Sequence, residues 1–210
     1  MRPGFEHPII YLITAGEATD STLATSRDNI LSLIRLAIEE KVSLIQLREK
    51  SLSPRPLFEL ARAAVALTEK SETRLLVNGW AGIALAARAD GVHLSASSLT
   101  PAAVVRKNLP AGFIIGVSTH SFDAADAVKH DADFVVFGPV FETPGKGEAT
   151  GLKKLTQVCD KLRAFPVVGL GGIDESNCES VMDAGASGIA AIRSLNDPDS
   201  LRSIVRKLRK

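Results

Sequence analysis

The chain has 210 residues, of which 45% are hydrophobic and 23% charged, so it can bury a substantial core and is not a disordered segment. Its 25 basic and 24 acidic residues give a formal net charge of +1, which leaves no overall field to attract nucleic acid or an anionic membrane. The sequence contains neither a recognisable signal peptide nor an apolar stretch long enough to span a membrane. We therefore expect a cytoplasmic protein with small-molecule partners and one domain over residues 1–210, with a homo-oligomer left open.

The first half of the chain alternates short apolar runs with segments of helical periodicity. In chain order, we expect a strand at 9–13, a helix at 28–40, a strand at 44–48 and a helix at 54–70. A strand at 75–77, a helix at 81–88 and a strand at 92–94 follow. Thr100 and Pro101 then suit the N-cap and first residue of another helix.

The second half continues in the same way. A strand at 114–117 is followed by a helix that Ser121 could cap, and a strand at 134–137 precedes a Gly/Pro-rich loop and a helix at 152–163. The last strands, at 167–170 and 188–192, are separated by a helix at 176–184, and a helix at 199–209 ends the pattern. Cys159 and Cys178 show neither metal-ligand nor disulfide spacing.

Eight strand–helix alternations determine the expected fold class. Nearly continuous apolar strands separated by helices indicate an α/β protein with a parallel sheet buried on both faces. Six units would favour an open doubly wound sheet, whereas eight favour a single closed (β/α)8 TIM barrel. The absence of a glycine-rich nucleotide-binding motif after the first strand is consistent with the barrel.

The active groups of such a barrel lie at the carboxyl ends of its strands and in the loops that follow. Polar residues and glycines at these places are therefore the candidates for a functional site. They are Thr14, Gln46, Arg48, Lys50, Asn78, Ser118, His120, Thr143, Lys146, Gly171, Gly172, Arg193 and Ser194.

Two loops are candidates for binding phosphate. Gly171 and Gly172 follow the seventh strand, and Arg193 and Ser194 follow the eighth. In this fold those loops often bind phosphate, because glycine lets backbone N–H groups approach an anion and arginine adds a charged contact. The alternative is a tight turn beside a solvated arginine.

The end of the second strand carries a second polar group. Alternation sends Gln46, Arg48 and Lys50 to one side, where two cations and an amide would suit an anionic group or a polar heterocycle. An ordinary strand exit with a surface Glu/Lys pair is the alternative.

Two further features are candidates for catalysis or closure. His120, after the fifth strand, could act as an acid and base near neutral pH, although a lone loop histidine is often a surface or capping residue. Thr143 and Lys146 lie in the longest loop, which could close over a ligand or remain a solvated tip. His93, inside the fourth strand, suits a buried and hydrogen-bonded core residue.

Seven segments in register resemble a known superfamily over essentially the whole chain. They are QLREK at 46–50, LLVNG at 75–79, GVHL at 91–94, GVSTHS at 116–121, ADFVVFGPVFETPGKG at 132–147, GLGGI at 169–173 and DAGASGIAAI at 183–192. The order and spacing resemble those of the thiamine phosphate synthases and the TenI-like thiazole tautomerases.

The resemblance implies roles for the candidate residues. Gln46, Arg48 and Lys50 fall where the synthases hold the pyrophosphate of the aminopyrimidine substrate, and Asn78 and Ser118 fall at further substrate contacts. Thr143 and Lys146 fall in the loop over the thiazole phosphate and the pyrophosphate, and Gly172 with the Arg193–Ser194 turn falls at the thiazole phosphate cradle.

The departures from the synthase pattern concern the metal. Synthases carry Asn-Asp after the third strand and a second Mg²⁺-binding aspartate after the fourth, whereas this chain has Asn78-Gly79 and Ser98. The TenI-like tautomerases resemble this sequence in their Asn-Gly, in their His-Ser pair and in an FET loop similar to the one here.

Three hypotheses follow. The first is a metal-independent tautomerase that aromatises carboxythiazole phosphate, with His120 as acid and base and no metal or cofactor. The second is a thiamine phosphate synthase that couples aminopyrimidine pyrophosphate to thiazole phosphate and requires Mg²⁺. The third is a non-catalytic regulatory protein that binds a phosphate ligand.

Overall fold

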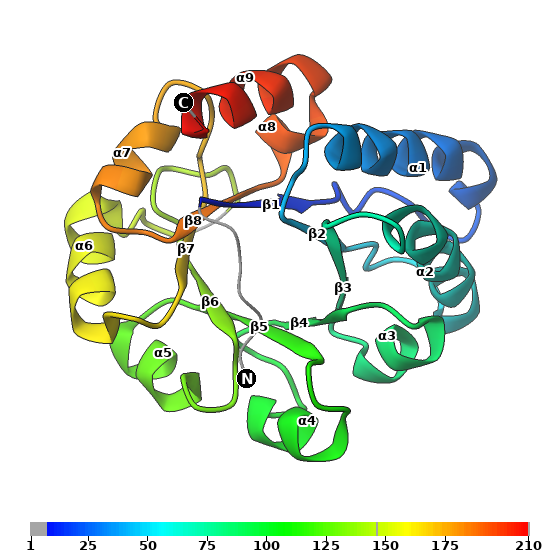
Figure 1. Cartoon of the computed structure of the whole chain (residues 1–210), viewed down its shortest axis with the longest axis horizontal. Helices are drawn as coiled ribbons and strands as arrows, with labels where there is room; N and C mark the ends of the chain where they lie inside the picture. Colours follow the sequence, from blue (N-terminus) through cyan, green and yellow to red (C-terminus); the bar gives the residue numbers. More distant parts are fainter. Residues whose placement is uncertain (1–7, 146, 210) are drawn as a thin grey trace.

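A ring of parallel strands surrounded by helices dominates the structure, a computed structural model that describes residues 8–145 and 147–209 (Figure 1). Within these residues, eight strands follow one another around a closed barrel in chain order, and β1 pairs with both β2 and β8. The expected (β/α)8 barrel is confirmed. The strands are β1 (Ile9–Ile13), β2 (Leu44–Leu47), β3 (Arg74–Asn78), β4 (Gly91–Leu94), β5 (Ile114–Thr119), β6 (Phe134–Phe137), β7 (Val167–Leu170) and β8 (Gly188–Ala191).

The helices cover the outside of the barrel (Figure 1). In the described part of the chain they are α1 (Leu23–Glu39), α2 (Pro54–Thr68), α3 (Ala81–Ala87), α4 (Ala102–Asn108), α5 (Phe122–Val128), α6 (Gly151–Leu162), α7 (Cys178–Asp183), α8 (Arg193–Asn196) and α9 (Pro198–Leu208). Ser121 caps α5 as expected, since its side chain accepts a hydrogen bond from the Ala124 N–H.

Two helix starts differ from the sequence expectation. Helix α1 begins five residues before position 28, because the hydroxyls of Thr25 and Ser26 donate to the Thr22 carbonyl and do not break the helix. Helix α4 begins at Ala102 behind an extended Pro101, so Thr100 is not its N-cap.

The strands separate two apolar layers. One set of side chains packs between the barrel and the helices, and the alternate set fills the barrel interior. Tyr11 and Phe134 are the bulkiest fully buried interior residues, and their rings meet edge-on with centroids 5.4 Å apart. The interior of the barrel is therefore a packed core.

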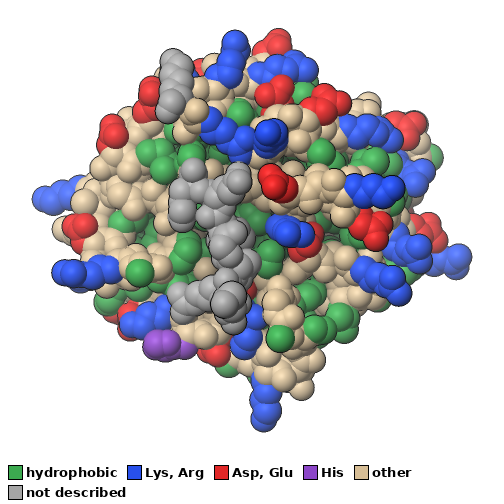
Figure 2. Space-filling view, viewed as in Figure 1, with side chains coloured by type: hydrophobic (Ala, Val, Ile, Leu, Met, Phe, Trp, Pro, Cys, Tyr) green, Lys and Arg blue, Asp and Glu red, His purple; other side chains and the backbone are tan. Residues whose placement is uncertain are grey.

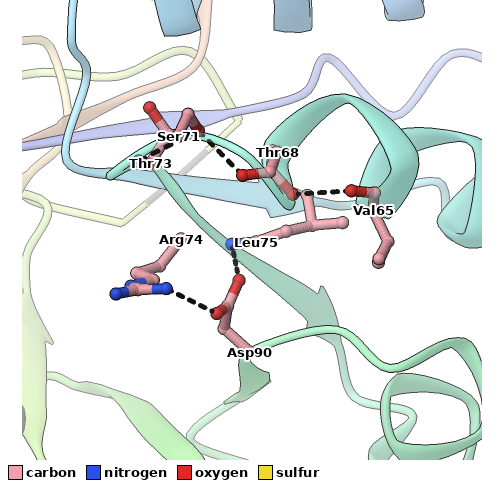
Figure 3. A network of polar contacts seen from close by, with 7 residues as sticks. All are labelled: Val65, Thr68, Ser71, Thr73, Arg74, Leu75 and Asp90. Carbon is pink, nitrogen blue, oxygen red and sulfur yellow. Dashed lines mark hydrogen bonds and ion pairs between the residues drawn. The ribbon is translucent and has the colours of Figure 1, made fainter.

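The amino ends of the strands are held by two carboxylates, one half-buried and one buried. Asp90, just before β4, accepts the Leu75 N–H at 2.8 Å and pairs with Arg74 at 3.3 Å (Figure 3). Asp133, just before β6, likewise accepts the Ile115 N–H at 2.8 Å and pairs with Arg106 at 2.6 Å. This end of the barrel is therefore organised for stability, and the opposite end is left for chemistry.

The charged side chains are mixed in sign on the face shown in Figure 2. Lysine and arginine lie among aspartate and glutamate there, without a continuous region of one charge. Among the described residues, the helices are all too short or too polar to cross a bilayer.

Candidate active site

The sequence-predicted residues lie at one end of the barrel, which we call the rim: the carboxyl ends of the strands and the loops that follow them. Because all strands are parallel, residues that follow different strands converge there. Twelve of the thirteen candidates are described, and Lys146 lies outside the described residues. The residues brought to the rim are Thr14, Arg48, Lys50, Asn78, Ser118, His120, Thr143, Gly171, Gly172, Arg193 and Ser194. Gln46 was also expected at the mouth, but it lies inside β2, is 2% exposed and donates its amide N–H to the buried Tyr11 hydroxyl.

A buried carboxylate that the sequence reasoning did not single out organises the end of β2. Glu49 is 3% exposed and accepts hydrogen bonds from the Thr14 hydroxyl at 2.6 Å and the Ala18 N–H at 2.9 Å. The same hydroxyl accepts the Arg48 N–H at 2.9 Å. Glu49 therefore ties the loop after β1 to the loop after β2 and fixes the backbone that carries Arg48.

The guanidinium of Arg48 remains available for an anion. It lies against the backbone of Ala15, with Nη1 3.5 Å from the carbonyl oxygen, and no described carboxylate lies within ion-pair distance of it. A half-buried arginine without a carboxylate partner is suited to binding an anionic group of a ligand. Lys50 is exposed just beyond it, and Asn78 is half-buried at the end of β3.

The loops after β7 and β8 expose backbone donors. Gly171 and Gly172 have φ values of 106° and 63°, which favour glycine. The Ser194 hydroxyl donates to the Ile173 carbonyl at 2.7 Å and links the two loops. Within the described part of the chain, the N–H groups of Gly172, Arg193 and Ser194 donate to no protein acceptor. Three such donors beside an exposed arginine form a suitable cradle for phosphate.

His120 is exposed at the rim beyond β5. Its Nδ1 lies 2.5 Å from the Gly138 carbonyl oxygen, which can only accept a hydrogen bond, so Nδ1 carries a proton. In the neutral ring Nε2 is then unprotonated and able to take a proton. Thr143, in the loop after β6, donates its hydroxyl to the Phe141 carbonyl at 3.0 Å.

A polar chain runs beneath the rim through the barrel interior. Ser118 contacts His93, His93 contacts Tyr11, and Tyr11 contacts Gln46, with distances of 2.8, 3.2 and 3.0 Å. Burial lowers the pKa of His93 to about 3 and raises the pKa of Tyr11 above its ordinary value. Both side chains are therefore neutral near pH 7.

His93 is the buried, hydrogen-bonded residue expected from the sequence, whereas Tyr11 was read only as part of an apolar strand. A usable signal was present in the alternation of β1, which places Tyr11 on the same face as Ile9 and Ile13, toward the barrel interior. A phenol buried there requires a hydrogen-bond partner.

The side chains of the rim do not suit a carboxylate-bound Mg²⁺. The two positions at which the resemblance expects aspartate are Gly79 and Ser98, and the nearby Glu49 is already hydrogen-bonded to the protein. Among the described residues, no group of three or more His, Cys, Asp or Glu could hold a metal ion. Mg²⁺ prefers hard anionic oxygen ligands, and this rim supplies none at those two positions.

The fold and the convergent rim define a (β/α)8 barrel with the layout of an enzyme. Comparison with known proteins identifies its family: residues 10–195 match the family model described as thiamine monophosphate synthase. The chain is 45% identical over 195 residues to a putative thiamine-phosphate synthase from Geobacter sulfurreducens, covering 90% of this chain and 88% of that protein. It is 38% identical to the thiamine-phosphate synthase of Moorella thermoacetica, covering 85% of this chain and 86% of that one.

A solved structure supports the same family assignment. Thiamine phosphate pyrophosphorylase from Pyrococcus furiosus superposes with a TM-score of 0.79 at 28% identity, covering 97% of this chain and 98% of that one. The chain belongs to the thiamine monophosphate synthase family and is an enzyme of thiamine biosynthesis. The names of these relatives favour the synthase hypothesis over the tautomerase hypothesis.

Proposed function

We propose that the chain binds a carboxythiazole phosphate at the rim and isomerises it to the aromatic tautomer without a protein-bound metal. The observation that carries this proposal is His120, whose Nδ1 is anchored to the Gly138 carbonyl and whose Nε2 remains available for the substrate. The neighbouring rim lacks the two carboxylates that a synthase uses for Mg²⁺, and proton transfer does not need them.

The proton transfer requires one group that can both accept and donate. Neutral His120 takes a proton from the substrate at Nε2, and the resulting imidazolium returns a proton at another atom of the substrate. No bond other than those to hydrogen breaks, so no leaving group has to be stabilised. The hydrogen bond to Gly138 holds the ring orientation in both protonation states, because Nδ1 is a donor in each.

The remaining rim residues would hold the substrate in place. The backbone cradle of Gly171, Gly172, Arg193 and Ser194 suits the phosphate, and Arg48 with Lys50 suits the carboxylate. The other proposed contacts are Asn78, Ser118, Thr143 and Lys146. Gln46 lies beneath them in the barrel interior, where its amide nitrogen donates to the Tyr11 hydroxyl.

The synthase is the second candidate, because the relatives are named for it. It would use the same cradle for thiazole phosphate, and Arg48 with Lys50 for the pyrophosphate of the second substrate. Any Mg²⁺ would then have to be held mainly by the pyrophosphate, water and hydroxyls such as that of Ser98. The rim does not supply the carboxylate ligands that Mg²⁺ usually takes.

One assay separates these candidates. Purified protein is offered carboxythiazole phosphate alone, and separately aminopyrimidine pyrophosphate with thiazole phosphate, each with Mg²⁺ or with EDTA. We expect isomerisation that EDTA does not change. Mg²⁺-dependent release of pyrophosphate with formation of thiamine phosphate would instead establish the synthase, and binding without turnover of either set would establish a regulatory protein.

The role of His120 is tested with a matched pair of variants. We expect His120→Asn to lower the isomerisation rate by about 10²–10⁴-fold, the usual contribution of a general acid–base. His130→Asn changes an exposed histidine that follows the carboxyl end of α5 and should retain the wild-type rate. Full activity of the His120 variant would exclude the proton-transfer role.

We also propose that residues 1–210 form one domain. The pairing of β1 with β8 supports this, because the first and last strands of the described chain complete the same barrel. Limited proteolysis that releases a stable fragment lacking either strand would contradict it.

A further inference from the structure

One chain of hydrogen bonds crosses the barrel interior from β2 to β5. Gln46 Nε2 donates to the Tyr11 hydroxyl at 3.0 Å, the hydroxyl lies 3.2 Å from His93 Nδ1, and His93 Nε2 lies 2.8 Å from Ser118 Oγ. Tyr11, Gln46 and His93 are at most 2% exposed, whereas Ser118 is half-buried at the rim. Ser118 is therefore the member that faces the substrate site most openly.

The donors and acceptors give this chain a direction. The Tyr11 oxygen accepts from Gln46, so its own proton is free to be donated to His93 Nδ1. A neutral imidazole that accepts at Nδ1 carries its proton on Nε2, and it donates that proton to Ser118 Oγ. Because burial lowers the pKa of His93 to about 3, the neutral ring persists at neutral pH. The Ser118 proton then points away from His93.

Packing holds the chain in this arrangement. A Cβ at Gly116 would lie 2.8 Å from His93 Nδ1 and 2.4 Å from the Phe134 ring, so glycine at this position makes room for the imidazole. The Phe134 ring in turn packs edge-on against Tyr11. Polar groups in such an interior are costly unless their hydrogen bonds are satisfied, and here each satisfies the next.

We propose that Tyr11 and His93 are positioning residues that keep the Ser118 hydroxyl as a hydrogen-bond donor toward the bound substrate. Ser118 then selects a substrate atom that accepts, such as an anionic oxygen or an unprotonated ring nitrogen, and disfavours an N–H group at the same place. The identity of the substrate rests on the proposed function, whereas the direction of the hydrogen-bond chain does not.

Two substitutions at one position separate donation to Ser118 from the mere presence of a polar group. The amide nitrogen of His93→Gln can reach the place of Nε2 and donate to Ser118, whereas the shorter His93→Asn reaches only the place of Nδ1. We expect His93→Asn to lower kcat/KM for carboxythiazole phosphate about tenfold, the effect of one lost hydrogen bond, and His93→Gln to recover most of it. Equal losses in both variants would overturn the proposal.

A double-mutant cycle tests whether His93 acts through Ser118. In a Ser118→Ala background, His93→Asn should change kcat/KM by less than about twofold, because the hydroxyl that it positions is absent. A full tenfold loss in that background would show that His93 acts elsewhere. Tyr11→Phe, which removes the donor to Nδ1 and keeps the ring, should give a smaller loss that Ser118→Ala likewise abolishes.

A measurement on the unmodified protein tests the direction of the hydrogen-bond chain and does not require enzymatic activity. Nitrogen-15 NMR of the histidine rings should show His93 protonated at Nε2 and unprotonated at Nδ1 near neutral pH. The opposite tautomer would reverse the chain, make Ser118 a donor to His93 and overturn the proposal. Absence of turnover, by contrast, would count against the proposed function alone, because the tautomer is still observable.

Discussion

Substitution of Gly172 by alanine should damage both stability and phosphate binding. Gly172 has a φ of 63°, and a Cβ there would lie 2.7 Å from the Glu142 carbonyl oxygen and 2.8 Å from Phe141 Cβ. The left-handed backbone costs about 1 kcal/mol for a non-glycine residue, and forced overpacking costs about 1–3 kcal/mol more. We therefore expect Gly172→Ala to lower the free energy of unfolding by about 2–4 kcal/mol.

The matched control is Gly112→Ala. Gly112 has a φ of 89° but nothing within 4 Å of an added Cβ, and it lies at the opposite end of the barrel, between α4 and β5. It should lose only about 1 kcal/mol. Urea unfolding of both variants gives the stability difference, and calorimetric titration with thiazole phosphate should show at least about a tenfold loss of affinity for Gly172→Ala alone.

The reasoning would be refuted if Gly172→Ala matched Gly112→Ala in stability and bound thiazole phosphate as tightly as the wild type. The steric contact would then relax without cost, and the loop after β7 would not need its present path. A loss of affinity without a loss of stability would show that the backbone donors matter but that the contact with Phe141 does not strain the fold.

Two further predictions concern the interior and the amino end of the barrel. An unfolded histidine titrates near pH 6.5, whereas burial holds the pKa of His93 near 3 in the folded state. Between these values only the unfolded state binds the proton, so the free energy of unfolding should fall by about 1.4 kcal/mol per pH unit as the pH decreases. His93→Gln should remove this pH dependence of the free energy of unfolding, measured by urea titrations between about pH 6 and pH 4. An unchanged pH dependence in the variant would show that His93 is not its source. Asp133→Ala should cost about 3 kcal/mol, because it removes the carboxylate partner of Arg106 and leaves the buried Ile115 N–H without its acceptor. Asp90→Ala, whose side chain is 29% exposed, should cost about 1 kcal/mol, and thermal unfolding that ranks the two variants in the opposite order would contradict this account.

Local sequence patterns predicted the order of the strands and helices well. The differences between the predicted and observed helices have local causes. The threonine- and serine-rich start of α1 resembles a loop, but its hydroxyls donate back to the carbonyl of the N-cap residue Thr22. The turn of α8 was not anticipated, because four residues are too few to show a helical period. The Ser121 cap was found because capping depends on one side chain and a backbone N–H only three residues later in the chain.

The candidate site was only partly accessible to the same reasoning. Position after a strand is enough to collect Arg48, Ser118 and His120 at one rim, since the carboxyl ends of all parallel strands meet there. The hydrogen-bond partners of the site residues could not be predicted in the same way. The role of Glu49 depends on the loop after β1, and the role of His93 depends on a tyrosine 82 positions away.

The sequence by itself determined that apolar strands and amphipathic helices alternate eight times, and that alternation selects the barrel because buried parallel strands need helices on their outer face. The tertiary structure alone decided which interior side chains meet. Periodicity tells which face of a strand a residue occupies, but contact across the barrel also depends on the register between strands that are distant in the chain. For that reason the hydrogen-bond chain from Gln46 to Ser118 could be identified only from the tertiary structure of the closed barrel.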